Sequence, residues 1–496
     1  MRPQERSQRR RSPIRRRHRS LAERRDRRID GSARGVGRLN RSRFVAPALL
    51  LGCGLLVGCA SSNLSVLDRR DDPASDSPSV SSDQDYREFL DDAIDSIEEF
   101  WANEYPRVYD GEYLPLVGGV HGHRPDNAAP LPSGCDFEGA YADVEENAFY
   151  CDDGDFIVFD DEILFPTFAE EFGVVVIGVV MAHEWGHVIQ SPMRNDVLDW
   201  YRVTTLELQA DCFAGAWTAH ARDVGVGGRS ISDRDITASL LGLVQLGDRP
   251  GDAPTDPAAH GSAFDRVSAF QEGFIGGTEP CVAYETNEPL PLQFGFTTEE
   301  LSRPNPSDFP FDDEMFDLLV GDLDLFWSAV LGERWSTPEV VLDEGLTSCD
   351  DEVPSTLGVR VCPTENRLLV DVDVMFDVYR DTPGDFAVGY LLAVGFGDLV
   401  QEALSLDLDG ETRHLLNDCL AGAWSGDILP LNLAPAVPPS EETPRVSLSP
   451  GDLDEAILAI ITIGDASDDL DERGSPFEKV DAFRQGVFNG SSACLG

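Results

Sequence analysis

An apolar segment that ends in a histidine motif constrains this chain more than any other feature. The segment covers residues 174–190 and contains His183, Glu184 and His187 in the order His-Glu-x-x-His. In a helix, residues four apart face the same side, so two imidazoles can bind one Zn²⁺ while Glu184 lies beside the water on the metal. The motif predicts a metallopeptidase site, with a chance match on a surface helix as the alternative.

A carboxylate motif follows the two histidines at a usable distance. A catalytic zinc site needs three protein ligands and one open position. Residues 205–217 predict a second helix with Glu207 and Asp211 on one face. The five residues resemble the pattern of the thermolysin-like (gluzincin) clan. That resemblance implies that Glu207 is the third zinc ligand and that Asp211 orients a zinc-bound histidine.

A wider resemblance covers about residues 84–283. The segments 183–190 and 207–217, together with 147–151 and 260–262, look like those of the bacterial family of putative neutral zinc metallopeptidases. The resemblance implies zinc dependence and peptidase activity. The expected fold is α+β and zincin-like, mostly helical with a small edge sheet.

Two further sites come from the same comparison. Asn147 and Ala148 resemble the pair that binds the substrate backbone on the edge strand of thermolysin-like enzymes, where an extended chain can pair with the sheet. His260 precedes a predicted helix at 267–274. It is either an ordinary loop histidine or a donor that stabilises the oxyanion of the reaction, and the sequence leaves both readings open.

The beginning of the chain has the features of an export signal. Residues 1–43 are rich in arginine, and a short apolar run at 44–57 precedes Cys59. This arrangement looks like a bacterial lipoprotein signal in which Cys59 carries the lipid, with Cys53 in a weaker competing site. An uncleaved anchor or an ordinary export signal are the alternatives. Residues 60–83 are rich in Ser, Asp and Pro and predict a flexible tether.

The second half of the sequence repeats the first. Asp211 to Trp217 returns as Asp418 to Trp424, and residues 261–270 return as 474–483. Repeats of this length indicate a tandem duplication. We therefore predict a metallopeptidase domain at 84–283, a linker at 284–307 and a second domain at 308–496.

The second copy lacks the predicted chemistry. In register with the first copy, His183 falls on Val394, Glu184 on Gly395 and His187 on Asp398. Glu207 falls on His414. We therefore expect one Zn²⁺ per chain, bound only by the first copy. The second copy is then a binding module, a regulatory module or a stabilising neighbour.

The cysteines fit an exported protein. Ten occur in the chain, and eight remain once Cys53 and Cys59 belong to the signal. A bridge kept in both copies must join equivalent pairs, and an oxidising compartment favours such bridges. The predicted pairs are Cys135 with Cys151, Cys212 with Cys281, Cys349 with Cys362, and Cys419 with Cys494.

The charge of the chain limits its partners. The formal net charge is −51 in spite of the basic start, and Lys479 is the single lysine. Such a chain repels nucleic acid, so we expect peptide or protein substrates and a membrane contact only through the lipid. Two other readings stay open, namely a non-catalytic surface scaffold and a zinc hydrolase acting on another amide, such as cell-wall peptide.

Overall fold

The structure is a computed structural model, and it describes most of the chain after residue 81. The described residues are 14–16, 82–126, 132, 134–135, 139–191, 203–256, 259–343, 349, 353–382, 384–408, 410–432, 434–438, 445–464 and 473–496. The predicted lipidation site Cys59 and nearly all of the predicted tether lie outside them. Ser82 and Asp83 belong to the first helix rather than to the tether.

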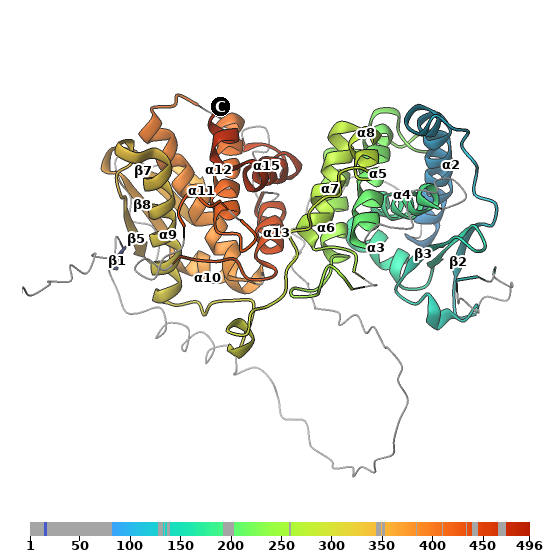
Figure 1. The fold of residues 1–496 in the computed structure, drawn as a ribbon, viewed down its shortest axis with the longest axis horizontal. Coiled ribbons are helices and arrows are strands. Elements are labelled where there is room, and N and C mark those ends of the chain that lie inside the picture. The colour runs from blue at the N-terminus through green and yellow to red at the C-terminus, as the bar shows by residue number, and fades with distance from the viewer. Residues whose placement is uncertain are drawn as a thin grey trace, which may run out of the picture.

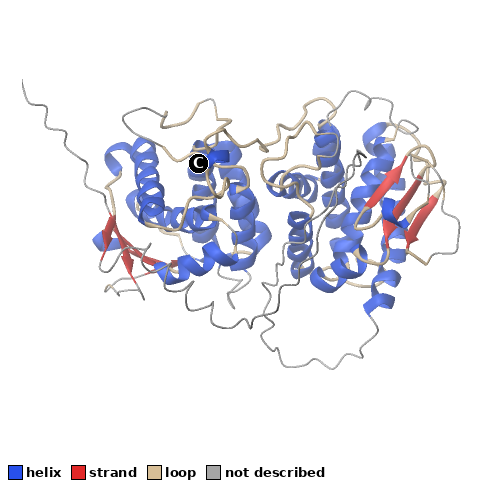
Figure 2. Ribbon diagram, turned by 90° about the horizontal axis from the view of Figure 1, so that it is seen from below, coloured by secondary structure: helices blue, strands red, loops and turns tan. Residues whose placement is uncertain are grey.

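The protein has the predicted α+β architecture, in which helices dominate and the sheets are small. Two helical halves lie side by side (Figure 1). Each half carries its sheet on the side that faces away from the other half (Figure 2).

The first half contains a three-stranded sheet and seven α-helices among its described residues. Its elements are α2 (Ser82–Tyr109), β2 (Gly119–His123), η2 (Tyr141–Asp143), β3 (Ala148–Cys151), β4 (Phe156–Asp160), α3 (Leu164–Phe172), α4 (Val175–Gln190), α5 (Val203–Val224), α6 (Asp233–Gln245), α7 (Ala263–Gly276) and α8 (Thr278–Ala283). The sheet order is β2-β4-β3, with β2 parallel and β3 antiparallel to β4. Strand β3 therefore lies at an edge.

The second half begins after the 3-10 turn η3 (Glu300–Ser302). Its elements are α9 (Asp313–Leu331), η4 (Gly332–Arg334), β5 (Glu339–Asp343), β6 (Val353–Thr356), β7 (Val359–Cys362), η5 (Pro363–Glu365), β8 (Arg367–Asp371), α10 (Val372–Asp381), α11 (Asp385–Leu404), α12 (Gly410–Asp427), α13 (Asp452–Gly464) and α15 (Pro476–Leu495). The sheet order is β5-β8-β7-β6, and the short β1 (Ile14–Arg16) pairs with β5. Strand directions in β5-β8-β7 match those in β2-β4-β3. This is what a duplication would produce, and the duplication itself stays a prediction.

One apolar helix forms the centre of each half. Every residue of α4 except His187 is buried, as expected for a helix that is apolar on all sides. Helix α11 is long and apolar enough to cross a membrane, but it lies buried inside the second half and is therefore a core helix. Helix α5 packs so closely on α7 that a Cβ on Gly215 would lie 1.9 Å from the Phe270 carbonyl oxygen.

Four disulfides occur among the described cysteines, and they are the predicted ones. They join Cys135 to Cys151, Cys212 to Cys281, Cys349 to Cys362, and Cys419 to Cys494. The long bridges hold α5 to α8 in the first half and α12 to the end of α15 in the second. The predicted pairing is confirmed in both halves.

The two halves contact each other through polar and aromatic groups. The Asp454 carboxylate at the start of α13 accepts a hydrogen bond of 2.7 Å from the Phe264 amide in the first turn of α7. Gln271 Nε2 donates to the Phe477 carbonyl at 2.8 Å, and the rings of Phe274 and Phe477 lie 4.7 Å apart. The predicted linker is not a loose tether, because its residue Leu292 is buried.

Candidate metal centre

The three predicted zinc ligands converge between α4 and α5. His183 Nε2 lies 3.2 Å from His187 Nε2. Glu207 Oε2 lies 3.3 Å from His183 Nε2, and Glu207 Oε1 lies 3.5 Å from His187 Nε2. The helical spacing of four residues brings the two imidazoles together, and the packing of α5 against α4 adds the carboxylate.

These distances fit a zinc ion. Zn–N and Zn–O bonds of about 2.0–2.1 Å place the ligand atoms of a tetrahedral site about 3.3–3.4 Å apart. The buried Glu207 Oε2 has no hydrogen-bond partner, and such an oxygen is costly unless a positive group meets it. Two imidazoles and one carboxylate are a ligand set that Zn²⁺ accepts, with a fourth position left open.

Two buried charged residues, Asp211 and Arg266, support His183 on the side of the imidazole that faces away from His187 and Glu207. Asp211 Oδ1 lies 2.7 Å from His183 Nδ1, so it can accept that N–H and leave Nε2 free for a metal. Arg266 donates to both oxygens of Asp211, from Nε at 2.8 Å and from Nη2 at 2.9 Å. Arg266 Nη1 donates to the Leu246 carbonyl at 2.8 Å. The carboxylate is therefore held on two sides.

An amide relay supports the second histidine. Gln190 Oε1 lies 2.9 Å from His187 Nδ1 and can accept its N–H. Gln190 Nε2 donates to the Leu206 carbonyl and to Gln209 Oε1. Gln209 then donates to the Cys281 carbonyl, beside a disulfide. Both imidazoles are thus fixed through the nitrogen that faces away from the centre.

The charges at the centre alter the pKa values of the buried groups. Burial lowers the pKa of His183, but the Asp211 and Glu207 carboxylates together outweigh this effect and raise the pKa to about 10. Burial raises the pKa of Glu207, yet the two histidines hold it well below its usual range. Asp211 stays ionised for the same reason, since Arg266 and His183 lower its pKa.

Glu184 is as deeply buried as the candidate ligand His183. Its side chain is buried, and burial raises the pKa of its carboxyl. His183 and His187 act in the opposite direction, and so does His260. The structure shows no contact between His260 and the three candidate ligands.

The other predicted site residues lie on neighbouring elements. Ala148 is the first residue of the edge strand β3, and Asn147 precedes it. Among the described residues β3 pairs only with β4, and it packs beside α4. The exposed Asn147 side chain accepts the Ala148 amide at 2.9 Å. The edge itself is confirmed, and the role of the pair stays a prediction.

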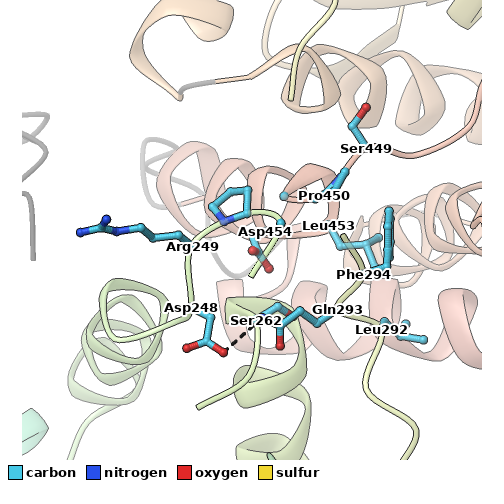
Figure 3. A pocket seen from close by; sticks show the side chains of 13 residues that line it. Asp248, Arg249, Ser262, Leu292, Gln293, Phe294, Ser449, Pro450, Leu453 and Asp454 are labelled. Atoms are coloured by element: carbon cyan, nitrogen blue, oxygen red, sulfur yellow. Dashed lines mark hydrogen bonds between the residues drawn. The ribbon is translucent and has the colours of Figure 1, made fainter. Parts of the chain in front are cut away.

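His260 lies on a loop that is held by Asp248. The Asp248 carboxylate accepts the backbone amides of His260 and Gly261 and lies 3.7 Å from His260 Nδ1. Gln293 Nε2 donates to the same carboxylate at 3.1 Å. Figure 3 shows this contact beside Asp454, on the wall of a small pocket between the two halves. The half-exposed His260 side chain is thus held beside Asp248.

In the second half Asp398, which aligns with His187, belongs to an ion pair. Arg413 Nη2 lies 2.8 Å from Asp398 Oδ1, and Asn417 Nδ2 donates to the same oxygen at 2.7 Å. Burial and nearby positive charges lower the pKa of His414 to about 4. No group of three metal-binding side chains occurs there among the residues that the structure describes.

Sequence reasoning missed several supporting residues. Gln190 lies three residues after His187 and therefore on the same helix face, which is a signal that the sequence does contain. Arg266 and Asp248 gave no local signal, because Arg266 lies 55 positions from Asp211 and Asp248 is a loop residue.

The fold and this site place the protein among α+β proteins with a candidate metal centre between two core helices. Residues 14–284 match the family described as "Putative neutral zinc metallopeptidase", and the chain belongs to this family. The family description implies a zinc ion and a peptidase-type hydrolase.

Individual relatives give less information. The uncharacterized protein Rv2575 of Mycobacterium tuberculosis is 29% identical over 160 residues, which cover 27% of this chain and 54% of that protein. The uncharacterized protein YpfJ of Escherichia coli is 26% identical over 177 residues, which cover 32% of this chain and 56% of that protein. The chain thus spans about half the length of these relatives. No solved structure matches.

Proposed function

We propose that the protein is an exported zinc peptidase that hydrolyses peptide bonds at the centre formed by His183, His187 and Glu207. The observation that supports this proposal is the tetrahedral spacing of the three ligand groups around a buried Glu207 oxygen without a partner. Zinc, when bound there, supplies a Lewis acid that lowers the pKa of water towards about 7.

Glu184 is the general base of the proposed reaction. Its carboxylate accepts a proton from the attacking water and then delivers it to the leaving amine. Burial raises the pKa of Glu184, which makes its carboxylate a stronger proton acceptor. Asp211 and Gln190 keep the ligand imidazoles in one tautomer and one orientation.

The edge strand β3 is the proposed binding surface for substrate. An extended peptide can pair with the edge of a sheet through its own backbone groups, so one edge accepts many sequences. Asn147 and Ala148 begin this edge, beside α4. His260 is the proposed donor to the oxyanion, and Asp248 limits its movement.

The proposed location is the cell envelope, outside the cytoplasm, with the chain anchored by a lipid on Cys59. Four disulfides support an oxidising compartment. The net charge of −51 is unfavourable for nucleic acid, so the proposed partners are peptide or protein substrates and the membrane that holds the lipid.

Metal analysis tests the centre directly. Purified full-length protein should contain one zinc per chain, and the double variant His183→Ala with His187→Ala should contain none. Two zinc ions per chain, or zinc retained by the double variant, would refute the assignment.

Activity assays test the chemistry. Casein and a peptide library should be cleaved, and a chelator should stop the cleavage. Glu184→Gln should keep zinc but lose turnover, because an amide cannot accept the proton, whereas Glu207→Ala should also lose zinc. Substantial activity in Glu184→Gln would exclude the general-base role, and cleavage of cell-wall peptide but not of casein would identify a different amide hydrolase.

A further inference from the structure

A second group of carboxylates lies in the second half, outside the candidate zinc centre. Asp308 precedes α9, Asp385 is the first residue of α11, and Glu455 is in the first turn of α13. One carboxylate oxygen from each lies within 4.8 Å of the others. The side chains of Asp452 and Glu300 border the group.

Two buried carboxylate oxygens in this region have no partner. Asp385 and Asp452 are each 4% exposed. Asp385 Oδ2 accepts the Phe309 amide at 3.1 Å and Asp452 Oδ2 accepts the Ser449 amide at 2.8 Å, but the Oδ1 atom of each has no hydrogen-bond partner. A buried carboxylate oxygen without a partner costs more free energy than a buried neutral oxygen without one. These two atoms therefore indicate a missing positive partner.

The contact between Asp308 and Glu455 also indicates a missing positive partner. The two carboxyl groups lie within hydrogen-bonding contact of each other. Two ionised carboxylates have no hydrogen to share, so the contact requires either a proton or a cation between them. Glu455 Oε2 also accepts the Phe386 amide at 2.8 Å, which fixes the side chain in this position.

The positive charge that faces the group is small compared with its negative charge. Five carboxyl groups act on one another here, those of Glu300, Asp308, Asp385, Asp452 and Glu455. Arg303 is the one cation among the strongest influences on Asp385. The amino-terminal ends of α11 and α13 add partial positive charge. Burial raises the pKa of Asp385 to about 7 in spite of these groups.

We propose that Asp308, Asp385 and Glu455 bind one hard divalent cation, with calcium as its probe, and that Asp452 supplies a further oxygen. An all-oxygen carboxylate set suits Ca²⁺, which accepts six to eight ligands in flexible geometry. Asp308 is only partly buried, so a path from solvent exists. The cation would join the segment before α9 to the starts of α11 and α13.

Calcium titration of the zinc-loaded full-length chain tests the site. Calorimetry at pH 7.5 should show one saturable Ca²⁺ per chain, and a hundredfold excess over Kd should raise Tm by about 3–8 °C. The double variant His183→Ala with His187→Ala should keep the same response, because the proposed site does not involve the zinc centre. The absence of saturable binding in both proteins would overturn the proposal and leave shared protons as the occupant.

Variants locate the binding. Asp385→Asn and Glu455→Gln should each remove the calcium response, whereas Glu402→Gln, which makes the same charge change on the exposed side of α11, should retain it. A calcium response in Asp385→Asn and Glu455→Gln equal to that of Glu402→Gln would overturn the assignment. If neither variant folds, the number of Ca²⁺ ions bound by the double variant His183→Ala with His187→Ala decides whether the chain has one calcium site or none.

Discussion

Replacing Arg266 by alanine tests whether the buried charges behind the zinc ligands support the centre. Arg266 is 3% exposed and Asp211 is fully buried. The guanidinium makes two of the hydrogen bonds that Asp211 accepts, and the His183 imidazole makes another. Arg266→Ala therefore leaves a buried carboxylate whose remaining polar partner is a zinc ligand.

The expected loss is large. Removing one partner of a buried ion pair costs about 3–5 kcal/mol of unfolding free energy, because the other charge stays buried. Loss of a group that hydrogen-bonds a metal ligand typically weakens metal binding by about 10- to 100-fold, and Arg266 acts on the candidate ligand His183 through one such group, Asp211. We expect both effects in Arg266→Ala.

Two measurements check this expectation. Urea unfolding of the chelator-treated protein gives the stability, and competition with a chromogenic chelator gives the zinc affinity. The double variant Arg266→Ala with Asp211→Asn should recover part of the lost stability, because it removes the unpaired charge. Lys479→Ala is a matched control, since Lys479 lies 3.9 Å from Asp418 in the second half and its loss should leave zinc affinity unchanged.

The free energy of unfolding of Arg266→Ala could instead lie within about 1 kcal/mol of the wild-type value, with the zinc affinity unchanged. That result would show that the buried Asp211 carboxylate does not need Arg266 as its partner.

Three other changes should have measurable effects. Gly215→Ala and Gly422→Ala should each destabilise the protein by about 1–3 kcal/mol or more in urea unfolding, because the new Cβ would lie 1.9 Å or 2.0 Å from a backbone oxygen of the facing helix. Replacing both Cys212 and Cys281 by alanine should cost up to about 4 kcal/mol, since the bridge spans 69 residues, and thermal unfolding with and without reductant checks this. Burial raises the pKa of Asp454 to about 7, so its native carboxyl binds a proton that the unfolded chain loses near pH 4. Stability should therefore fall as pH rises from about 4 to 7, and Asp454→Asn should remove about 1–3 kcal/mol of that fall in a pH series.

The three candidate zinc ligands could be brought together from the sequence because their geometry is local. His183 and His187 meet through helical spacing alone, and Glu207 lies one helix later in the chain. The disulfides could be predicted because the repeat restricts which cysteines are equivalent. In both cases a regularity within the sequence itself was sufficient, so the prediction did not require the fold.

The supporting contacts could not be predicted, because they depend on how distant helices pack. Arg266 reaches Asp211 only because α7 lies against α5. Asp454 reaches the Phe264 amide only because the second half packs on the first. The buried acid group at Asp385 was also missed, since its carboxylates are separated by 70 or more positions and meet through folding.

The positions of the second half that align with the candidate metal ligands carry a different set of charges. Removing imidazoles would leave nearby acidic groups without a positive partner, and an uncompensated buried charge is strongly destabilising. In this protein Asp398 lies where His187 lies in the first half, and Arg413 and Asn417 both contact it. Arg413, which directly precedes the position that aligns with Glu207, thus supplies a protein cation beside Asp398. In the second half Arg413 therefore offsets charge of Asp398 without a metal ion.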